Sequence, residues 1–249
     1  MQPIVELKNI SLKYQTPTAE TEAIRDISLS INKGEFISIV GPSGCGKSTL
    51  LSIISGLISP TSGSIIKDKN LRTGYMLQKD HLFEWRTILS NALLGLEVKN
   101  ELNEETIQYT EDLLEKYGLA YFKNHRPSEL SGGMRQRAAL IRTLAIKPDV
   151  LLLDEPFSAL DYQTRLSVSD EIGTIIKKEN KTAILVTHDI SEAISLSDRV
   201  CVLSSRPAVL KAIHKIDFEI PERTPMHSRE AVEFKDYFNT IWKELDYNE

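Results

Sequence analysis

The stretch FISIVGPSGCGKSTLLSIIS, residues 36–55, decides the fold of this chain. Its first five residues are mostly apolar and β-branched, which is typical of a buried strand. The run breaks into a glycine-rich loop, and a helical pattern resumes at Thr49. From Gly41 to Ser48 the loop matches G-x-x-x-x-G-K-[ST] in the strand-to-helix setting that this pattern requires. The stretch therefore predicts a phosphate-binding loop at the start of a helix.

The residue types of this loop suit an anionic ligand. Glycines let backbone N–H groups turn inward around an anion, and the helix start adds the positive end of its dipole. Lys47 can reach the β- and γ-phosphates of a nucleoside triphosphate, and the Ser48 hydroxyl can hold Mg²⁺. The alternative is a glycine-rich turn that merely caps a helix. The residues expected to contact the nucleotide are Gly41, Pro42, Ser43, Gly44, Cys45, Gly46, Lys47, Ser48 and Thr49.

The composition is that of an ordinary globular protein of 249 residues, with 41% hydrophobic and 26% charged residues. A net charge of −5 excludes a global basic field for nucleic acid. Two cysteines, Cys45 and Cys201, supply no disulfide framework, which favours a reducing, cytosolic setting. We expect no signal peptide and no membrane span, because no basic start precedes an apolar core and no apolar run reaches about 18 residues. A membrane role would therefore require a partner.

The rest of the pattern predicts a β-rich start, a long helical stretch and a return to alternating strands and helices. Strands of alternating polarity are expected at Ile4–Tyr14 and Ala23–Ile31, and they suggest an antiparallel layer. The helical stretch runs from Trp85 to Lys147, with a helix starting at Asn103. Further strands are expected at Ser64–Lys67, Thr73–Leu77, Val150–Asp154, Thr182–Thr187, Arg199–Ser204 and Val209–Ile216, further helices at Arg165–Lys178, Ser191–Ser197 and Ala231–Leu245, and a linker at Pro221–Pro225.

This order of elements predicts an α/β fold with a parallel open sheet that binds its ligand at the carboxyl ends of the strands. Asp154 and Glu155 end one buried strand, and His188 follows another. A carboxylate at Asp154 can hold Mg²⁺ through water, whereas Glu155 can orient an attacking water or accept its proton. The alternative for this pair is a solvated turn. His188 can contact a γ-phosphate, although a lone histidine at a strand end is more often structural.

The segment LSGGMRQR, which begins at Leu130, predicts a second anion-binding loop. Ser131, Gly132 and Gly133 precede a helix, so backbone N–H groups would face an anion at its N-terminus. One nucleotide does not need both loops from one chain. Two copies placed head to tail would give each nucleotide one loop from each copy, with ATP in the seam. The plainer interpretation is an N-cap followed by a flexible helix start.

With these residues in view, the chain resembles the ATP-binding cassette (ABC) ATPases, the ATP-hydrolysing subunits of ABC transporters, over nearly its whole length. The resemblance implies a P-loop NTPase (RecA-like) core with a parallel sheet, an N-terminal antiparallel β layer and an inserted α-helical subdomain. The matching motifs are Walker A at Gly41–Ser48, the LSGGQ signature at Leu130–Gln136, Walker B at Val150–Asp154, the catalytic glutamate Glu155, the Q-loop Gln78, the D-loop Ser158–Asp161, the switch His188 and the adenine-stacking Tyr14. Met134 stands where the family usually has Gln, which leaves the serine and both glycines of the signature intact.

The resemblance also assigns roles. ATP and Mg²⁺ are the implied cofactors, with Ser48, Gln78 and Asp154 as metal ligands and Glu155, His188, Gln78 and Lys47 as catalytic residues. Tyr14, Ser131, Gly132, Gly133 and Asp161 are added to the loop residues as nucleotide-binding positions. By position alone, Tyr14 is equally well explained as a plain tyrosine at a strand end. The implied organisation is one ABC ATPase domain over 1–249, with the α/β core at 1–84 and 148–220, the helical subdomain at 85–147 and a C-terminal linker and helix at 221–249.

A narrower resemblance points to uptake. The signature segment, together with LFEWRT at 82–87 and NALLGLE at 91–97, is similar to the importer ATPases for nitrate, sulfonate and taurine, a group that includes transporters of vitamin precursors. The family often has Pro-Trp-Leu where this chain has Glu84-Trp85-Arg86. The implied protein is a homodimer on the cytoplasmic face of the membrane. It would drive a separate permease, serve an extracytoplasmic solute-binding protein indirectly and bind no nucleic acid.

The loop Lys79–Thr87 is the expected permease-docking surface, because it connects the core with the helical subdomain. Trp85 is its expected anchor, or else part of the subdomain core. Two rival functions are an ABC ATPase of DNA repair or translation and a small-molecule P-loop kinase. The first class usually has paired cassettes or long coiled-coil inserts, which this chain lacks, and the loop at 131–133 argues against the second.

Overall fold

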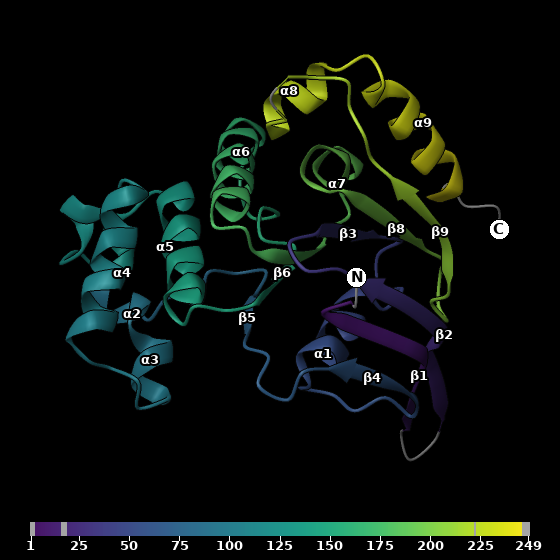
Figure 1. Cartoon of the computed structure of the whole chain (residues 1–249), viewed down its shortest axis with the longest axis horizontal. Coiled ribbons are helices and arrows are strands. Elements are labelled where there is room, and N and C mark those ends of the chain that lie inside the picture. The colour runs from purple at the N-terminus through teal and green to yellow at the C-terminus, as the bar shows by residue number, and fades with distance from the viewer. Residues whose placement is uncertain (1–2, 16–18, 222, 246–249) are drawn as a thin grey trace. The chain divides into compact units, whose positions relative to one another are not determined.

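The computed structural model of the chain describes residues 3–15, 19–221 and 223–245 (Figure 1). They fall into two units, Met1–Leu71 with Gly173–Glu249, and Arg72–Ile172. The first unit holds the glycine-rich loop, and the second holds most of the helical stretch.

An antiparallel sheet forms the start of the first unit. Its strands are β1 (Val5–Gln15), β2 (Glu20–Ile31) and β4 (Ser62–Lys67), in the order β2-β1-β4. The alternating apolar side chains of β1 and β2 are buried, which is the pattern that predicted this layer. The strand predicted from Ala23 begins earlier, at Glu20, because the register with β1 continues to the pair Gln15–Glu20.

A mainly parallel sheet is the core of the first unit. Here β3 (Phe36–Val40) lies between β7 (Thr182–Val186) and β8 (Arg199–Leu203), parallel to both, and β9 (Leu210–Lys215) adds an antiparallel edge. All residues of β3 and β7 are buried, as in sheets that are covered on both faces. Ser38, the polar residue within β3, bonds to the hydroxyl of Ser197.

Helices cover this sheet. The loop that follows β3 leads into α1 (Lys47–Ser55), while α7 (Ile190–Leu196), α8 (Pro225–Glu230) and α9 (Phe234–Leu245) follow later in the chain. Figure 1 shows α7 and α9 on the same side of β8, where Ile194, Val202 and Ile241 share one apolar cluster. The segment predicted as a linker contains the start of α8, which begins with Thr224 accepting from His227 N and Pro225 at the first helical position.

The second unit combines two parallel strands with a helical bundle. The strands are β5 (Thr73–Met76) and β6 (Val150–Asp154). The helices are α2 (Ile88–Ala92), α3 (Leu94–Val98), α4 (Glu104–Lys116), α5 (Gly132–Ala145) and α6 (Tyr162–Lys178), with single 3₁₀ turns at Ala120–Phe122 and Pro127–Glu129. Asn103 caps α4, as predicted, and α2, α3 and α4 all contact α5. Helix α6 starts in this unit and ends in the other.

The predicted architecture is confirmed: an antiparallel β layer, a parallel α/β core and a helical region between the strands of that core. Both cysteines are buried free thiols. Within the described ranges, none of the helices has the length and hydrophobicity needed to cross a bilayer.

Candidate functional site

The glycine-rich loop lies at the carboxyl end of β3, as predicted. Gly44 and Gly46 have φ values of 72° and 129°, which glycine adopts without strain. At Gly46 a Cβ would also lie 3.1 Å from the carbonyl oxygen of Ala23. No side chain in the described part of the chain caps α1, and its first turn has no acidic residue. Backbone N–H groups at a helix start of this kind suit an anion.

Lys47 is held inside the loop. Its side chain is 6% exposed, and its Nζ donates to the carbonyl oxygens of Gly41 and Pro42 at 2.8 and 3.0 Å. These bonds satisfy the hydrogen-bonding needs of a buried ammonium group. An incoming phosphate would offer the same ammonium a charged acceptor, which makes a stronger hydrogen bond than a carbonyl does.

Two side chains flank the loop. Tyr14 is 41% exposed, and its hydroxyl lies 3.5 Å from Thr49 Oγ1, so its ring is free to stack on a base. Arg206 Nη2 donates to Gly44 O at 2.8 Å and so steadies the tip of the loop. No sequence motif marks Arg206, which sequence reasoning missed. Burial raises the pKa of the Cys45 thiol within the loop, so this cysteine stays a neutral packing residue.

His188 lies at the same sheet edge as the loop. The parallel register of β3 and β7 pairs Ile39 with Val186, which brings the residues after both strands to one edge. Thr187 Oγ1 donates to the buried Glu192 carboxylate at 2.7 Å, and Asp189 caps α7 through Ser191 N at 2.8 Å. These contacts fix the backbone on either side of His188, whose side chain is exposed.

The second unit brings together Gln78, Asp154 and Glu155, because β5 and β6 are parallel neighbours that end at one edge. Gln78 Nε2 donates to Glu155 Oε2 at 3.4 Å and to Ser158 Oγ at 3.3 Å. The Tyr75 hydroxyl donates to Asp154 Oδ2 at 3.3 Å. Sequence reasoning missed this contact, because Tyr75 belongs to no motif.

The backbone at Glu155 is strained. Its φ of 44° is in the left-handed region, which a glutamate seldom occupies. Such strain persists where surrounding contacts fix it, often at sites of function. Ser158 supplies one contact, since its hydroxyl donates to Glu155 O at 3.0 Å.

The oxygen groups at this edge suit Mg²⁺, which usually binds to one or two protein oxygens together with nucleotide phosphates. Asp154 is a half-buried carboxylate at a strand tip, and Gln78, which also carries an amide oxygen, contacts the next residue, Glu155. Across the described residues, no cluster of three or more His, Cys, Asp or Glu side chains could hold a metal alone. The oxygen groups of Asp154 and Gln78 fit the few protein ligands that Mg²⁺ takes when it binds together with a nucleotide.

The signature segment forms the start of α5. Ser131 is its N-cap, with Oγ accepting from Met134 N at 3.4 Å, and the first turn contains no acidic side chain. Gly132 is exposed, whereas a Cβ on Gly133 would lie 2.9 Å from Val168 Cγ2 of α6. Gly133 is thus required for close helix packing, and Gly132 leaves the helix start open.

Asp161 has a structural role in the same unit. Its Oδ1 accepts from Thr164 N at 3.1 Å, so it caps the first turn of α6. The hydrogen bonds from Thr164 lower the pKa of this exposed carboxyl group. Because the side chain is exposed, it also remains accessible to a partner.

Comparison with known proteins identifies the family. A family profile described as "ABC transporter" matches residues 24–158. The chain is 46% identical over 248 residues to an uncharacterized ABC transporter ATP-binding protein, YtlC, of Bacillus subtilis (strain 168), covering 97% of this chain and 95% of that protein. The chain belongs to the ATP-binding proteins of ABC transporters. It is therefore an ATPase.

Two other relatives of this ABC ATPase are named for transport. The taurine import ATP-binding protein TauB of Jannaschia sp. (strain CCS1) is 39% identical over 219 residues, which are 85% of this chain and 82% of TauB. The nitrate transport protein NasD of Klebsiella oxytoca is 38% identical over 217 residues, 84% of this chain and 83% of NasD. Among solved structures, the dimeric ATP-binding cassette MJ0796 bound to ADP and Pi has a TM-score of 0.72 at 32% identity and covers 86% of this chain and 99% of that chain.

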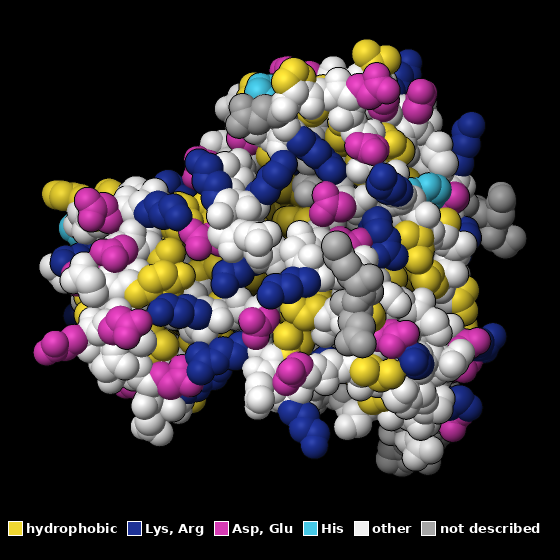
Figure 2. Space-filling model, viewed as in Figure 1, with side chains coloured by type: hydrophobic (Ala, Val, Ile, Leu, Met, Phe, Trp, Pro, Cys, Tyr) yellow, Lys and Arg dark blue, Asp and Glu magenta, His cyan; other side chains and the backbone are white. Residues whose placement is uncertain are grey.

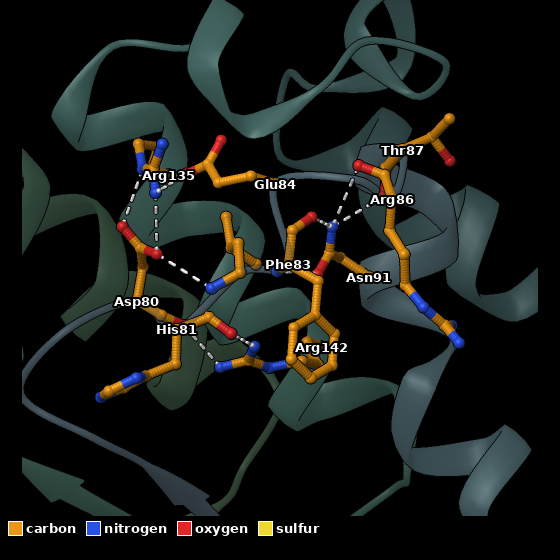
Figure 3. A network of polar contacts seen from close by, with 10 residues as sticks. Asp80, His81, Phe83, Glu84, Arg86, Thr87, Asn91, Arg135 and Arg142 are labelled. Carbon is orange, nitrogen blue, oxygen red and sulfur yellow. Dashed lines mark hydrogen bonds and ion pairs between the residues drawn. The ribbon is translucent and has the colours of Figure 1, made fainter.

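The loop Lys79–Thr87 of this ABC ATPase is fixed by a polar network (Figure 3). Arg135 donates from Nε to Asp80 Oδ2 at 2.8 Å and from Nη2 to Glu84 Oε1 at 2.8 Å. Arg142 donates to the backbone oxygens of Asp80 and His81 at 2.7 and 2.8 Å. Two arginines of α5 thereby hold the start of the loop.

A buried amide holds the other end of the loop. The side chain of Asn91, fully buried, accepts from Phe83 N at 2.7 Å and donates to Phe83 O at 3.0 Å. The ring of Phe83 stacks on Trp85 with centroids 4.7 Å apart, and Trp85 is 71% exposed. Trp85 is therefore not part of the core of the helical region, and its indole is exposed.

Proposed function

We propose that this ATPase powers solute uptake as the subunit of an importer, and that two copies clamp two Mg-ATP molecules in a head-to-tail dimer. The uptake direction is supported by the named function of TauB. The dimer is supported by the dimeric cassette with bound ADP and Pi among the similar structures. The solute would be of the nitrate, sulfonate, taurine or vitamin-precursor type, as the loop and signature segments suggest.

One observation carries the dimer proposal: within the described residues, two helices begin at or directly after glycines and have no acidic residue in their first turn. One is α1 after Gly46, and the other is α5 after Ser131. A single nucleotide needs only one of these loops for its phosphates. In a dimer, both loops of each copy contact a nucleotide, because each bound nucleotide lies between α1 of one copy and α5 of the other.

The proposed roles follow from the chemistry of each group. Lys47 neutralises the β- and γ-phosphates, and Glu155 orients the attacking water and accepts its proton. Gln78, which donates to Glu155 Oε2, positions that carboxylate and the water. His188 contacts the γ-phosphate, and Tyr14 stacks on adenine.

The remaining roles concern the metal and the partner copy. When bound, Mg²⁺ would neutralise phosphate charge, held by Ser48, Gln78 and Asp154. Ser131, Gly132 and Gly133 would meet the partner's nucleotide, and Asp161 would lie at the same seam. Closure of the dimer would change the facing of a permease, and hydrolysis would reopen the dimer.

The proposed permease contact is the loop Lys79–Thr87, with Trp85 as its anchor. The exposed indole and the rigid network behind it suit a docking site that transmits movement. The protein would then sit peripherally on the cytoplasmic face of the membrane. A solute-binding protein on the other side would act on it only through the permease.

The test is recovery of the complex. The tagged chain is co-expressed with the permease genes that neighbour its own, extracted in mild detergent and purified. Wild type should retain permease, Trp85→Ala should lose most of it, and Trp242→Ala should behave as wild type, since Trp242 is a similarly exposed tryptophan on α9. Recovery with DNA or ribosomes instead, or equal losses in both variants, would contradict the proposal.

A further inference from the structure

The first unit contains a cavity of about 610 Å³ that no proposed step of ATP hydrolysis uses. It lies between the end of α6, the segment before α8 and the residues that precede strands β3, β7 and β8. The phosphate loop follows the carboxyl end of β3, whereas this cavity lies at the amino ends of the parallel strands. Its size falls within the range of small-molecule sites.

Positive charge gathers around this cavity. Lys177, Lys178, Lys181 and Arg223 line it, and Asp198 is the one acidic residue among the described residues of the lining. Figure 2 shows Lys and Arg side chains gathered over this part of the surface, between α6 and α7, with hydrophobic side chains among them. The chain as a whole has a net charge of −5. The cluster of positive side chains therefore creates a local positive potential, which attracts anions.

The carboxylate of Asp198 already has hydrogen-bond and ion-pair partners within the protein. Asp198 Oδ2 accepts from Phe36 N at 2.9 Å, and its Oδ1 accepts from Arg223 Nη1 at 3.2 Å. Arg223 also donates to the backbone oxygens of Ser197 and Ile216. Arg223 and Asp198 therefore form one wall of the cavity, and among the described lining residues the three lysines are left without an acidic partner.

The lysines have few internal acceptors. Lys177 Nζ donates to Arg223 O at 3.1 Å, which satisfies one of its three N–H groups. Within residues 3–15, 19–221 and 223–245, neither the ammonium group of Lys178 nor that of Lys181 has a hydrogen-bond or ion-pair partner. The helix dipole accounts for the lysines in the last turn of α6, because it stabilises cations at a helix C-terminus. Lys181 follows α6 and precedes β7, so that explanation does not cover it.

The floor of the cavity is apolar. Phe36, Ile176 and Leu196, with exposed fractions of 8%, 1% and 9%, line it together with Pro225. An inorganic anion would use only the lysines, whereas a ligand with a hydrophobic part would also cover this floor. Apolar walls with a few convergent polar groups are typical of small-molecule sites.

We propose that this cavity binds a small organic anion that combines a phosphate or carboxylate group with an apolar moiety. The anionic group is held by Lys177, Lys178 and Lys181, and the apolar moiety packs on Phe36, Ile176 and Leu196. Because Arg223 precedes α8 and Pro225 is its first residue, a bound ligand ties the start of α8 to the sheet. The site is independent of the ATP site and of the proposed importer function.

The test uses phenyl phosphate as the probe, titrated calorimetrically into the full chain with its nucleotide site kept saturated by Mg-ADP. Lys178→Glu/Lys181→Glu should weaken binding at least about tenfold, because two attractions become repulsions. The matched control, Lys235→Glu/Lys243→Glu, changes the total charge equally on exposed positions of α9 and should stay within about twofold. Lys181→Gln, a milder change outside the helix, should give a smaller loss in the same direction.

Several results would overturn the proposal. One is no heat of binding with wild type, and another is an equal loss in the two double variants. Inorganic phosphate should bind more weakly than phenyl phosphate, and equal affinities would contradict the role of the apolar floor. Vesicles of phosphatidylglycerol and phosphatidylcholine provide the last arm. If Lys178→Glu/Lys181→Glu abolishes vesicle binding while phenyl phosphate does not bind, the lysines contact a membrane surface and the small-molecule proposal fails.

Discussion

The pair Asp80–Arg135 should contribute a measurable share of the stability of the second unit. Arg135 reaches Asp80 with two nitrogens, at 2.8 and 3.1 Å, and the two side chains are 24% and 19% exposed. Asp80 Oδ1 also accepts from Leu82 N at 2.9 Å. The pair is thus neither a surface ion pair nor a fully buried one, and its loss should have an intermediate cost.

The magnitude follows from these limits. Breaking a buried pair costs about 3–5 kcal/mol, and exposed pairs contribute about 0–1 kcal/mol. Asp80→Asn removes the charge but keeps an oxygen for Leu82 N, so we expect it to lower the free energy of unfolding by about 2 kcal/mol. The matched control is Glu84→Gln, which removes the other partner of Arg135. Glu84 is 53% exposed, and its loss should cost about 0.5 kcal/mol or less.

The pKa of Asp80 determines how the stability lost in Asp80→Asn changes with pH. Burial by itself raises the pKa of Asp80, but the hydrogen bonds from Arg135 and from Leu82 N outweigh it, so the pKa is lowered. A lowered folded-state pKa stabilises the protein above the unfolded pKa of about 4, and this contribution is lost as the pH falls through the folded value. The difference between wild type and Asp80→Asn should therefore be full at neutral pH and shrink in acid.

The assay is urea unfolding without nucleotide, followed by circular dichroism, together with a double-mutant cycle that adds Arg135→Gln. The cycle should return a coupling energy of about 1.5–2 kcal/mol. A loss below about 0.5 kcal/mol for Asp80→Asn, or a loss equal to that of Glu84→Gln, would refute the reasoning. A difference that grows as the pH falls would refute the assigned pKa direction.

Three further predictions concern the ATP site and its supporting helices. Lys47→Ala should weaken binding of a fluorescent ATP analogue at least about tenfold, since it removes the loop ammonium; unchanged affinity would contradict the loop assignment. Glu155→Gln should lower steady-state hydrolysis by about 10²-fold or more while ATP still binds and dimers accumulate in size-exclusion chromatography; normal turnover would remove Glu155 from its role. Gly133→Val should destabilise by about 1–3 kcal/mol in urea, because even a Cβ would lie 2.9 Å from Val168. Gly132→Ala should cost clearly less, because its nearest neighbour is the flexible end of Leu160 at 3.1 Å, and equal costs would argue against tight packing at Gly133.

Much of the fold was predictable because its signals are local. The strand-loop-helix pattern around Gly41–Ser48 specifies β3 and α1, and period-two alternation specifies β1 and β2. Element ends were less certain, since tertiary contacts decide them. The pairing with β1 extends β2 to Glu20, and the Thr224 cap starts α8 within a segment that was predicted as a linker.

Candidate site residues can be proposed from the sequence where a motif fixes a residue type at a fixed spacing. Arg206 and Tyr75 were missed because each contacts the site through folding and not through a motif. The strain at Glu155 could not be predicted, since a backbone dihedral depends on its surroundings. His125 and His214 belong to no motif and are half-buried; His214 Nε2 lies 2.7 Å from Glu244 Oε2 on α9, and the ring of His125 lies against Phe122.

The shared-site proposal is tested most directly by mixing two inactive variants. Lys47→Ala disables the phosphate loop, and Ser131→Arg blocks the start of α5, so neither variant should hydrolyse ATP alone. In a mixed head-to-tail dimer, one site carries both defects and the other carries none, so hydrolysis should return. Mixing Lys47→Ala with the double variant Lys47→Ala/Ser131→Arg leaves no intact site and should stay inactive. Continued inactivity of the first mixture, with mixed dimers present, or hydrolysis by Ser131→Arg alone as a monomer, would contradict the account.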